Sequence, residues 1–380
     1  MNILVFTIHY PLKNVDSTAT KAVHYFTKEW IKQGHRVVVV HNHIKLIDYF
    51  NANKKKKNID SYTIDGVEVL YCPINRYIPK FDYILKSDVR KVKKTVLDFL
   101  KSKNFLPDKF VVHFCAEQWQ IVEAIRKLLN CTPIPIFHNC DVKSDKRIKK
   151  IVTTINKIGY RSEKIRDKIL SVVDKNIETF QVFSGAPDYI FEINQSKSKI
   201  KKVKEDKKQL IYVGNLIPLK NIDITVKALA EIKDKYNYEF TIIGSGKSEK
   251  YLKKLVRVFN IEKRISFFPR KDRNEVLEFM RRSDCFIMVS QPETLGIVYI
   301  EAMASGCFVI GSKNEGIDGI IVDKESGLLV HPNEVKSLKE ALIYYFELDP
   351  YKQEMILKES SNQALKYRES TVSIDYLNNL

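Results

Sequence analysis

The sequence predicts an α/β protein built from two doubly wound, Rossmann-like domains, and three observations support this fold class. The chain has 380 residues, which is too long for one ordinary core and enough for two domains of similar size. Short apolar, β-branched runs recur between helix-like stretches, a pattern typical of parallel sheets covered on both faces. Near its middle the chain becomes polar, as a linker between domains does.

The first domain is expected over residues 1–190. Its apolar runs predict strands at Ile3–Ile8, Val37–Val40, Phe110–Phe114 and Ile134–Phe137. Between the first two, Thr18–Gln33 carries apolar residues at helical spacing, and Gly34 is a typical helix end. Repetition of this strand, helix, strand unit places ligand sites at the carboxyl ends of the strands.

The second domain is expected over residues 210–360, after a polar linker at 191–209. Its apolar runs predict strands at Leu210–Val213, Glu239–Ile243, Ile265–Phe268, Cys285–Val289, Phe308–Ile310 and Gly327–Val330. A last helix, at about 360–380, is expected to pack back on the first domain.

The net charge of +18 is concentrated in the first half, where residues 1–190 carry 33 Lys and Arg against 19 Asp and Glu, a net +14. Three explanations are open: a nucleic-acid surface, an anionic membrane surface, or the lysine-rich usage of an AT-rich genome. We expect no nucleic-acid partner, because no helix-turn-helix, zinc finger or aromatic RNA-binding pattern accompanies the lysines.

The six scattered cysteines show no CxxC pair, so the sequence predicts neither a zinc site nor a disulfide framework. The N-terminal apolar run lacks a basic start and a small-residue cleavage site, and we interpret it as a strand rather than a signal peptide. No run reaches the roughly 18 apolar residues of a membrane-spanning helix. A reducing, cytoplasmic location is therefore expected.

A first candidate binding segment follows the strand at Leu210–Val213. It runs through Gly214, Asn215 and Pro218 to Lys220, just before a helical stretch. Backbone donors near a helix start, together with one ammonium group, suit a diphosphate. The alternative is that Lys220 is one exposed lysine among many.

A second candidate segment is the Gly244-Ser-Gly246 turn at the end of the strand Glu239–Ile243. Glycines let a backbone approach a ligand closely. A plain tight turn explains the same two glycines equally well, because the third glycine of a dinucleotide fingerprint is missing.

The third segment, Ser290–Gly306, leaves room for about ten helical residues between two strands. Thr294, Leu295 and Gly296 would lie at the helix start, where unpaired N–H groups attract an anion. Glu293 lies in the loop and Glu301 in the helix, and a carboxylate accepts hydrogen bonds from vicinal sugar hydroxyls well. Two alternatives stay open: ordinary structural glutamates, or the two carboxylates of a glycosidase.

Together these segments resemble the retaining family-4 glycosyltransferases, the glycosyl transferases group 1, of the bacterial cell-surface polysaccharide type. The family pattern of Glu, seven residues, Glu, then Ala-Met-Ala-x-Gly-x-x-Val-Ile is met by Glu293, Glu301 and Ala302–Ile310. The stretch Asn314–Pro332 is similar as well. The resemblance implies the GT-B fold, in which two Rossmann-like domains face a central cleft.

By this resemblance, Glu301 would bind ribose hydroxyls, Glu293 the donor sugar's hydroxyls, and the amides of Thr294–Gly296 the β-phosphate. Lys220 would hold the diphosphate. Asn215 stands where the family has an arginine, so one charge-assisted phosphate contact is missing. Arg270 would lie near the base or the phosphates, although a surface arginine is nearly as good an interpretation.

The first half is similar to the family more loosely, as expected of an acceptor-binding domain. Ile136–Asp141 resembles a strand that ends in His-Gly-x-Asp, so His138 would approach the donor sugar and Asp141 the acceptor. The loop after the first strand has no glycine pair, and Ser17, Thr18 and Thr20 would supply hydroxyls instead.

The resemblance implies a metal-independent hexosyltransferase without a cofactor, and no clustered Asp-x-Asp motif is present. Glu293, His138 and Lys220 are the predicted catalytic residues. A nucleotide diphosphate sugar (UDP or GDP) would be the donor and a glycan or lipid-linked glycan precursor the acceptor, at the inner face of an anionic cell membrane. The alternatives are a sugar-nucleotide-binding protein without transfer activity and an epimerase or phosphorylase on the same fold.

Overall fold

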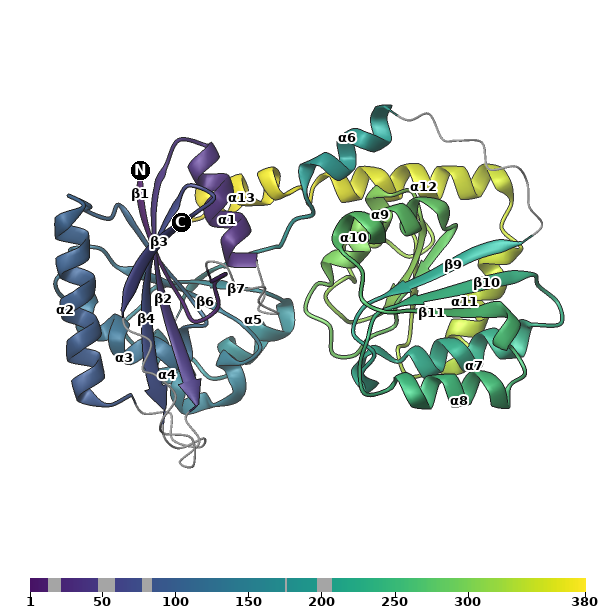
Figure 1. The fold of residues 1–380 in the computed structure, drawn as a ribbon, viewed down its shortest axis with the longest axis horizontal. Helices are drawn as coiled ribbons and strands as arrows, with labels where there is room; N and C mark the ends of the chain where they lie inside the picture. Colours follow the sequence, from purple (N-terminus) through teal and green to yellow (C-terminus); the bar gives the residue numbers. More distant parts are fainter. Residues whose placement is uncertain (13–21, 47–58, 77–83, 175, 197–206) are drawn as a thin grey trace. The chain divides into compact units, whose positions relative to one another are not determined.

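The computed structural model describes residues 1–12, 22–46, 59–76, 84–174, 176–196 and 207–380. The chain divides into two compact units (Figure 1). The first unit contains Met1–Phe183 and Ser373–Leu380, and the second contains Ser184–Val372.

The first unit is built on an eight-stranded sheet of order β3-β4-β2-β1-β5-β6-β7-β8. Its strands are β1 (Asn2–Thr7), β2 (Arg36–Leu46), β3 (Asp60–Ile64), β4 (Val67–Arg76), β5 (Lys109–His113), β6 (Pro133–Phe137), β7 (Lys157–Tyr160) and β8 (Glu178–Gln181). The pairings are parallel except for the antiparallel hairpin of β3 and β4, whose turn is Asp65-Gly66. Both turn residues have positive φ, as a tight two-residue hairpin requires.

The helices of this unit are α1 (Ala22–Lys32), α2 (Lys86–Ser102), α3 (Cys115–Arg126), α4 (Asp145–Val152) and α5 (Glu163–Leu170). Leu4 and Phe6 of β1 belong to a core cluster that includes residues of α2 and α3. The alternate residues Ile3 and Val5 are also fully buried, so the sheet is covered on both faces. As predicted, α1 ends before Gly34, which has φ +84° and donates its N–H to the carbonyl of Ile31.

The second unit contains an all-parallel six-stranded sheet of order β11-β10-β9-β12-β13-β14. Its strands are β9 (Lys208–Val213), β10 (Tyr238–Ile243), β11 (Ile265–Phe268), β12 (Cys285–Ile287), β13 (Phe308–Ser312) and β14 (Leu328–Val330). Each predicted strand of this half is present, with ends that differ from the prediction by at most two residues.

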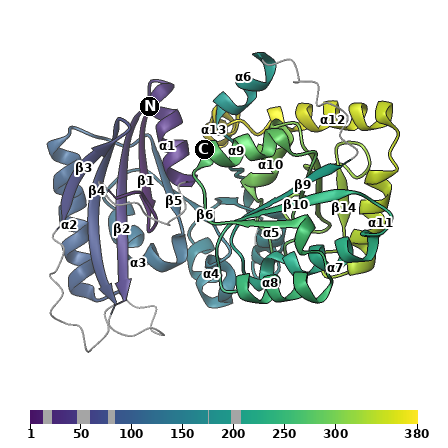
Figure 2. The ribbon, with the colours of Figure 1, turned by 45° about the vertical axis from the view of Figure 1, so that its right-hand side comes forward.

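Helices cover both faces of this sheet (Figures 1 and 2). The helices of the second unit are α6 (Asp188–Ser196), α7 (Ile222–Ile232), α8 (Glu249–Val258), α9 (Arg273–Arg282), α10 (Ile297–Ala304), α11 (Val335–Phe346) and α12 (Pro350–Leu365). In Figure 2, α7 and α8 lie on one side of the sheet and α9 and α10 on the other. The doubly wound α/β class predicted for this half is therefore confirmed.

The division of the chain differs from the expected boundary at residue 190. The second unit begins at Ser184, because Ala186 exchanges backbone hydrogen bonds with Tyr367 and Glu369 of the same unit. The expected linker at 191–209 overlaps the end of α6 and the start of β9, and its residues 197–206 lie outside the described part of the chain.

The expected helix at 360–380 is two helices, the end of α12 and α13 (Glu369–Asn378). Residues from Ser373 onward belong to the first unit. There the indole N–H of Trp30 donates to the carbonyl of Ser373 at 3.1 Å, and Lys109 Nζ donates to the carbonyl of Leu380 at 2.7 Å.

Candidate functional site

The loop after β9 carries Lys220 to the carboxyl-end edge of the second sheet. Lys220 ends a short 3-10 turn, and Asn221 follows with φ +50° as the residue before α7. The side-chain amide of Asn221 donates to the carbonyls of Val289 at 2.9 Å and Pro332 at 3.1 Å. These bonds hold the lysine loop against the loops that follow β12 and β14.

Lys220 forms an ion pair with Glu293 between these loops, and its Nζ lies 2.5 Å from Oε2 of the glutamate. The same carboxylate accepts from the hydroxyl of Ser290 at 3.0 Å and from the N–H of Thr294 at 3.1 Å. Only 20% of the lysine and 13% of the glutamate side chain are exposed. The structure therefore brings two of the predicted catalytic residues into one partly buried ion pair.

Glu315 is a site residue to which the sequence analysis assigned no role. This 4% exposed glutamate accepts the N–H of Glu293 at 2.8 Å. The next residue, Gly316, donates its N–H to the carbonyl of Glu293 at 3.1 Å, and a Cβ there would lie 1.7 Å from the carbonyl oxygen of Thr294. The Glu-Gly pair after β13 is the signal in the sequence that would have identified it.

Thr294, Leu295 and Gly296 directly precede α10, as predicted. Gly296 has φ +69° and is the residue before the first helical position. The N–H of Thr294 is bonded to Glu293, and the side chain of Leu295 is buried.

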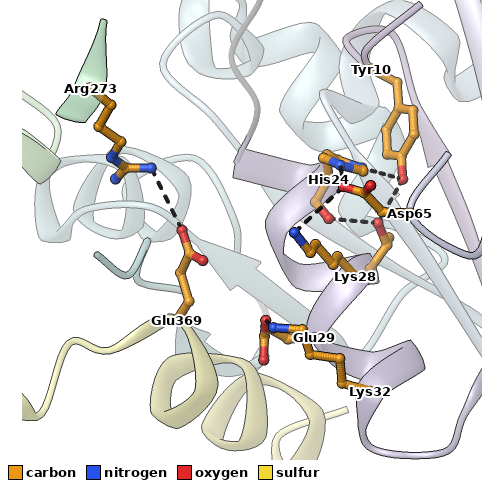
Figure 3. Close-up of polar contacts among 9 residues, drawn as sticks. Tyr10, His24, Lys28, Glu29, Lys32, Asp65, Arg273 and Glu369 are labelled. Carbon is orange, nitrogen blue, oxygen red and sulfur yellow. Dashed lines mark hydrogen bonds and ion pairs between the residues drawn. The ribbon is translucent and has the colours of Figure 1, made fainter. Parts of the chain in front are cut away.

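Glu301 lies inside α10 and is 8% exposed. It accepts a hydrogen bond from Arg273 Nε at 2.7 Å. Arg273 also faces Glu369 (Figure 3), with its Nη1 4.0 Å from Oε1 of that glutamate. Sequence reasoning missed Arg273, the first residue of α9, whose start is fixed by a capping box between Asp272 and Glu275.

The two glycines of the Gly244-Ser-Gly246 turn pack against the loop after β9. A Cβ on Gly244 would lie 1.8 Å from the carbonyl oxygen of Gly214, and one on Gly246 would lie 2.3 Å from that of Leu216. The backbones of the two loops touch, so both glycines are explained by packing between the loops and require no ligand.

Arg270, which follows β11, donates to the side-chain oxygen of Asn215. The backbone carbonyl of Asn215 accepts from the hydroxyl of Tyr212 at 3.1 Å. The exposed guanidinium of Arg270 is therefore held beside Asn215, the residue that stands where the family has an arginine.

His138 and Asp141 lie at the carboxyl end of β6 in the first unit. The carboxylate of Asp141 accepts the N–H groups of His138 at 2.7 Å and Ala116 at 2.8 Å. Asp141 is fully buried, and burial raises its pKa to about 7 although the two N–H donors oppose the shift. Asp141 was expected to contact the acceptor; its oxygens here accept two backbone N–H groups below the surface, and the acceptor contact stays a prediction.

The imidazole of His138 is held on two sides. It stacks on Phe114, with ring centroids 3.7 Å apart, and its Nε2 lies 3.2 Å from Nδ1 of His113. Phe114 has φ +53°, a strained conformation for a bulky residue and one found preferentially at functional sites. Burial and the neighbouring His113 and Arg161 hold the pKa of His138 well below its usual value, so the ring is neutral at neutral pH.

Ser17, Thr18 and Thr20 lie outside the described residues. Within the described ranges, no group of three or more His, Cys, Asp or Glu is placed to hold a metal ion. None of the described helices combines the length and the apolar composition that crossing a bilayer requires. All six cysteines are unbridged.

Comparison with known proteins adds to this geometry. Residues 194–362 match the family described as glycosyl transferases group 1. An uncharacterized glycosyltransferase of Haemophilus influenzae is 28% identical over 197 residues, which are 51% of this chain. The chain therefore spans about half (55%) of that relative's length. N-acetyl-alpha-D-glucosaminyl L-malate synthase of Bacillus anthracis is 22% identical over 324 residues, 83% of this chain and 81% of the relative.

Among solved structures, Anabaena HepE in complex with UDP and glucose has a TM-score of 0.65, at 16% identity and with both chains fully covered. This likeness shows the fold, which is of the GT-B type, as expected from the sequence. The match to the glycosyl transferases group 1 family covers the part of the chain that carries Lys220, Glu293 and Glu301.

Proposed function

We propose that the protein is a retaining, metal-independent glycosyltransferase of family 4 that moves a hexose-type sugar from UDP or GDP to a hydroxyl of a glycan or lipid-linked glycan precursor, in cell-surface polysaccharide synthesis. The observation that carries this proposal is the partly buried Lys220–Glu293 pair beside the start of α10. The family match and the UDP and glucose in the HepE structure support a nucleotide sugar donor.

Charge balance explains why Lys220 and Glu293 are paired. A diphosphate brings negative charge to a site that already holds a carboxylate, and the ammonium of Lys220 offsets both. During transfer, negative charge develops on the departing β-phosphate and positive charge on the sugar carbon. Lys220 stabilises the phosphate, and Glu293 accepts hydrogen bonds from the donor sugar's hydroxyls.

Glu301 can accept ribose hydroxyls while it keeps its bond to Arg273. A carboxylate has about four acceptor positions, and Arg273 Nε and Nη2 both approach Oε1 of Glu301, so they leave Oε2 to accept from a ligand. In retention, the acceptor hydroxyl attacks from the face that the diphosphate leaves, and a phosphate oxygen takes its proton. His138 contacts the donor sugar.

A turnover assay tests this proposal. UDP-glucose, UDP-galactose, UDP-N-acetylglucosamine and GDP-mannose are each incubated with the protein and glycan acceptors, with and without EDTA, and released nucleoside diphosphate and extended acceptor are measured. We expect at least one donor to be consumed equally with and without EDTA, and Glu293→Gln to reduce turnover by about a hundredfold or more.

Lys227→Ala is the matched control, because Lys227 pairs with Asp223 on α7 at 2.9 Å, away from the strand edge. It should leave turnover unchanged. A change of sugar configuration without nucleotide release would indicate an epimerase, and donor binding without turnover a binding protein; either result rejects the proposal.

The net +14 of residues 1–190 supports a second part of the proposal, peripheral association with the anionic inner face of the cell membrane. Vesicles with and without anionic lipid test it by co-sedimentation. Binding to anionic vesicles that weakens with salt is expected, and absence of salt-sensitive binding would contradict it.

A further inference from the structure

His138 is linked by hydrogen bonds to the C-terminal segment of the chain. The hydroxyl of Tyr376 lies 3.0 Å from Nε2 of His113, and Nδ1 of His113 lies 3.2 Å from Nε2 of His138. Tyr376 and His113 are 2% and 1% exposed, so bulk water does not compete for these contacts. Two imidazoles and a phenol therefore form one buried chain that ends at His138.

The direction of hydrogen bonding follows from where the proton of Tyr376 can go. Burial raises the pKa of Tyr376 well above its usual value despite nearby Arg161, so the hydroxyl keeps its proton. The rings around it belong to Phe26, Trp30 and Phe180, none of which offers a strong acceptor. The guanidinium of Arg161 only donates. Tyr376 therefore donates to Nε2 of His113.

This direction decides the state of both histidines. Burial lowers the pKa of His113 to about 3, so the ring is neutral and carries one proton. Since Nε2 of His113 accepts from Tyr376, the proton is on Nδ1 and is donated to Nε2 of His138. His138 must then carry its own proton on Nδ1, which forms no hydrogen bond with the described residues.

We propose that Tyr376 and His113 are positioning residues that fix His138 as the Nδ1–H tautomer and so make it a hydrogen-bond donor to a sugar hydroxyl oxygen. The identity of the acceptor atom rests on the proposed function, whereas the tautomer rests on the geometry alone. The backbone of His138 is fixed as well, through its bond to Asp141. The C-terminal segment thereby contributes to the site although it does not touch substrate.

Nitrogen NMR of the full-length protein labelled with 15N-histidine tests this inference. The signal of His138 is assigned by its loss in His138→Gln, and long-range proton–nitrogen correlations report which ring nitrogen is protonated. We expect Nδ1 in the wild type. In Tyr376→Phe, which keeps the ring and removes the hydroxyl, we expect a shift of the proton towards Nε2 and about threefold to tenfold slower sugar transfer.

The control is Tyr238→Phe, which removes a buried hydroxyl that donates to the carbonyl of Leu229 at 2.8 Å, in the second unit. It should change neither the tautomer nor the rate. A proton on Nε2 of His138 in the wild type overturns the inference without any variant, and so does an unchanged tautomer in Tyr376→Phe. If no nucleotide sugar is turned over but the tautomer behaves as expected, the proposed function fails and the positioning chain stands.

Discussion

At the scale of single residues, each of the two predicted glutamates is held by a basic partner. Glu293 pairs with Lys220 and Glu301 with Arg273. A carboxylate held in this way is oriented before a ligand arrives, which reduces the reorganisation needed at the moment of reaction.

Arg273→Gln tests the role assigned to the second pair. Loss of the guanidinium leaves Glu301 free to rotate, so KM for the nucleotide sugar should rise by about tenfold or more, with a smaller change in kcat. Arg281→Gln, which removes the partner of Glu278 on the same helix, is the control. Steady-state kinetics measure both, and equal KM values in the two variants would disprove a role for Arg273 in donor binding.

The residue types and order of the second-half site could be predicted, because Lys220, Glu293 and Glu301 lie in the two segments that follow the predicted strands β9 and β12. Their partners could not. Arg273 is 28 residues away from Glu301 in sequence and meets it only through the packing of α9 beside α10. Spacing along one segment contains no information about such a partner.

At the scale of elements, the strands that coincide with buried apolar runs could be predicted, whereas short, exposed or proline-containing strands could not. Strands β3, β4, β7 and β8 were not predicted from the sequence. Strand β3 is an edge strand with a largely exposed pattern, and β7 and β8 have four residues each. Strand β4 contains Pro73, a residue that argues against a central strand. In the described part of the chain, Pro73 lies beyond the residues of β4 that pair with β3.

Gly246→Ala tests how the two loops of the second unit pack. The new Cβ would lie 2.3 Å from the carbonyl oxygen of Leu216, and φ of Gly246 is outside the left-handed region, so the contact is the sole strain expected. The free energy of unfolding should fall by about 1–3 kcal/mol. Urea melts of the wild type and the variant measure the loss. An unchanged free energy of unfolding in Gly246→Ala would contradict the packing explanation.

At the scale of the whole molecule, buried histidines make stability depend on pH. Burial lowers the pKa of His41 to about 3, with His43 and His9 adding to the shift and the carbonyl of Ile8 opposing it. Between pH 3 and 6.5 the unfolded chain binds more protons at this site, so its contribution to stability is present above pH 6.5 and is lost as pH falls. The raised pKa of Asp141 acts in the opposite direction.

His41→Gln isolates the contribution of one histidine. Between pH 7.5 and 5.5 the wild type should lose about 1 kcal/mol more stability than the variant, because the unfolded imidazole gains a proton that the buried ring does not. Urea denaturation at the two pH values measures the difference. The same pH dependence in both proteins would show that His41 is not held neutral.

The account as a whole depends on a nucleoside diphosphate binding at the edge of the second sheet, and calorimetric titration with UDP and with GDP tests this most directly. We predict that at least one of them binds, that Lys220→Ala weakens binding by about tenfold or more through loss of a charge-assisted hydrogen bond, and that Lys227→Ala does not. No binding of either nucleotide, or the same affinity in Lys220→Ala as in the wild type, would contradict the account.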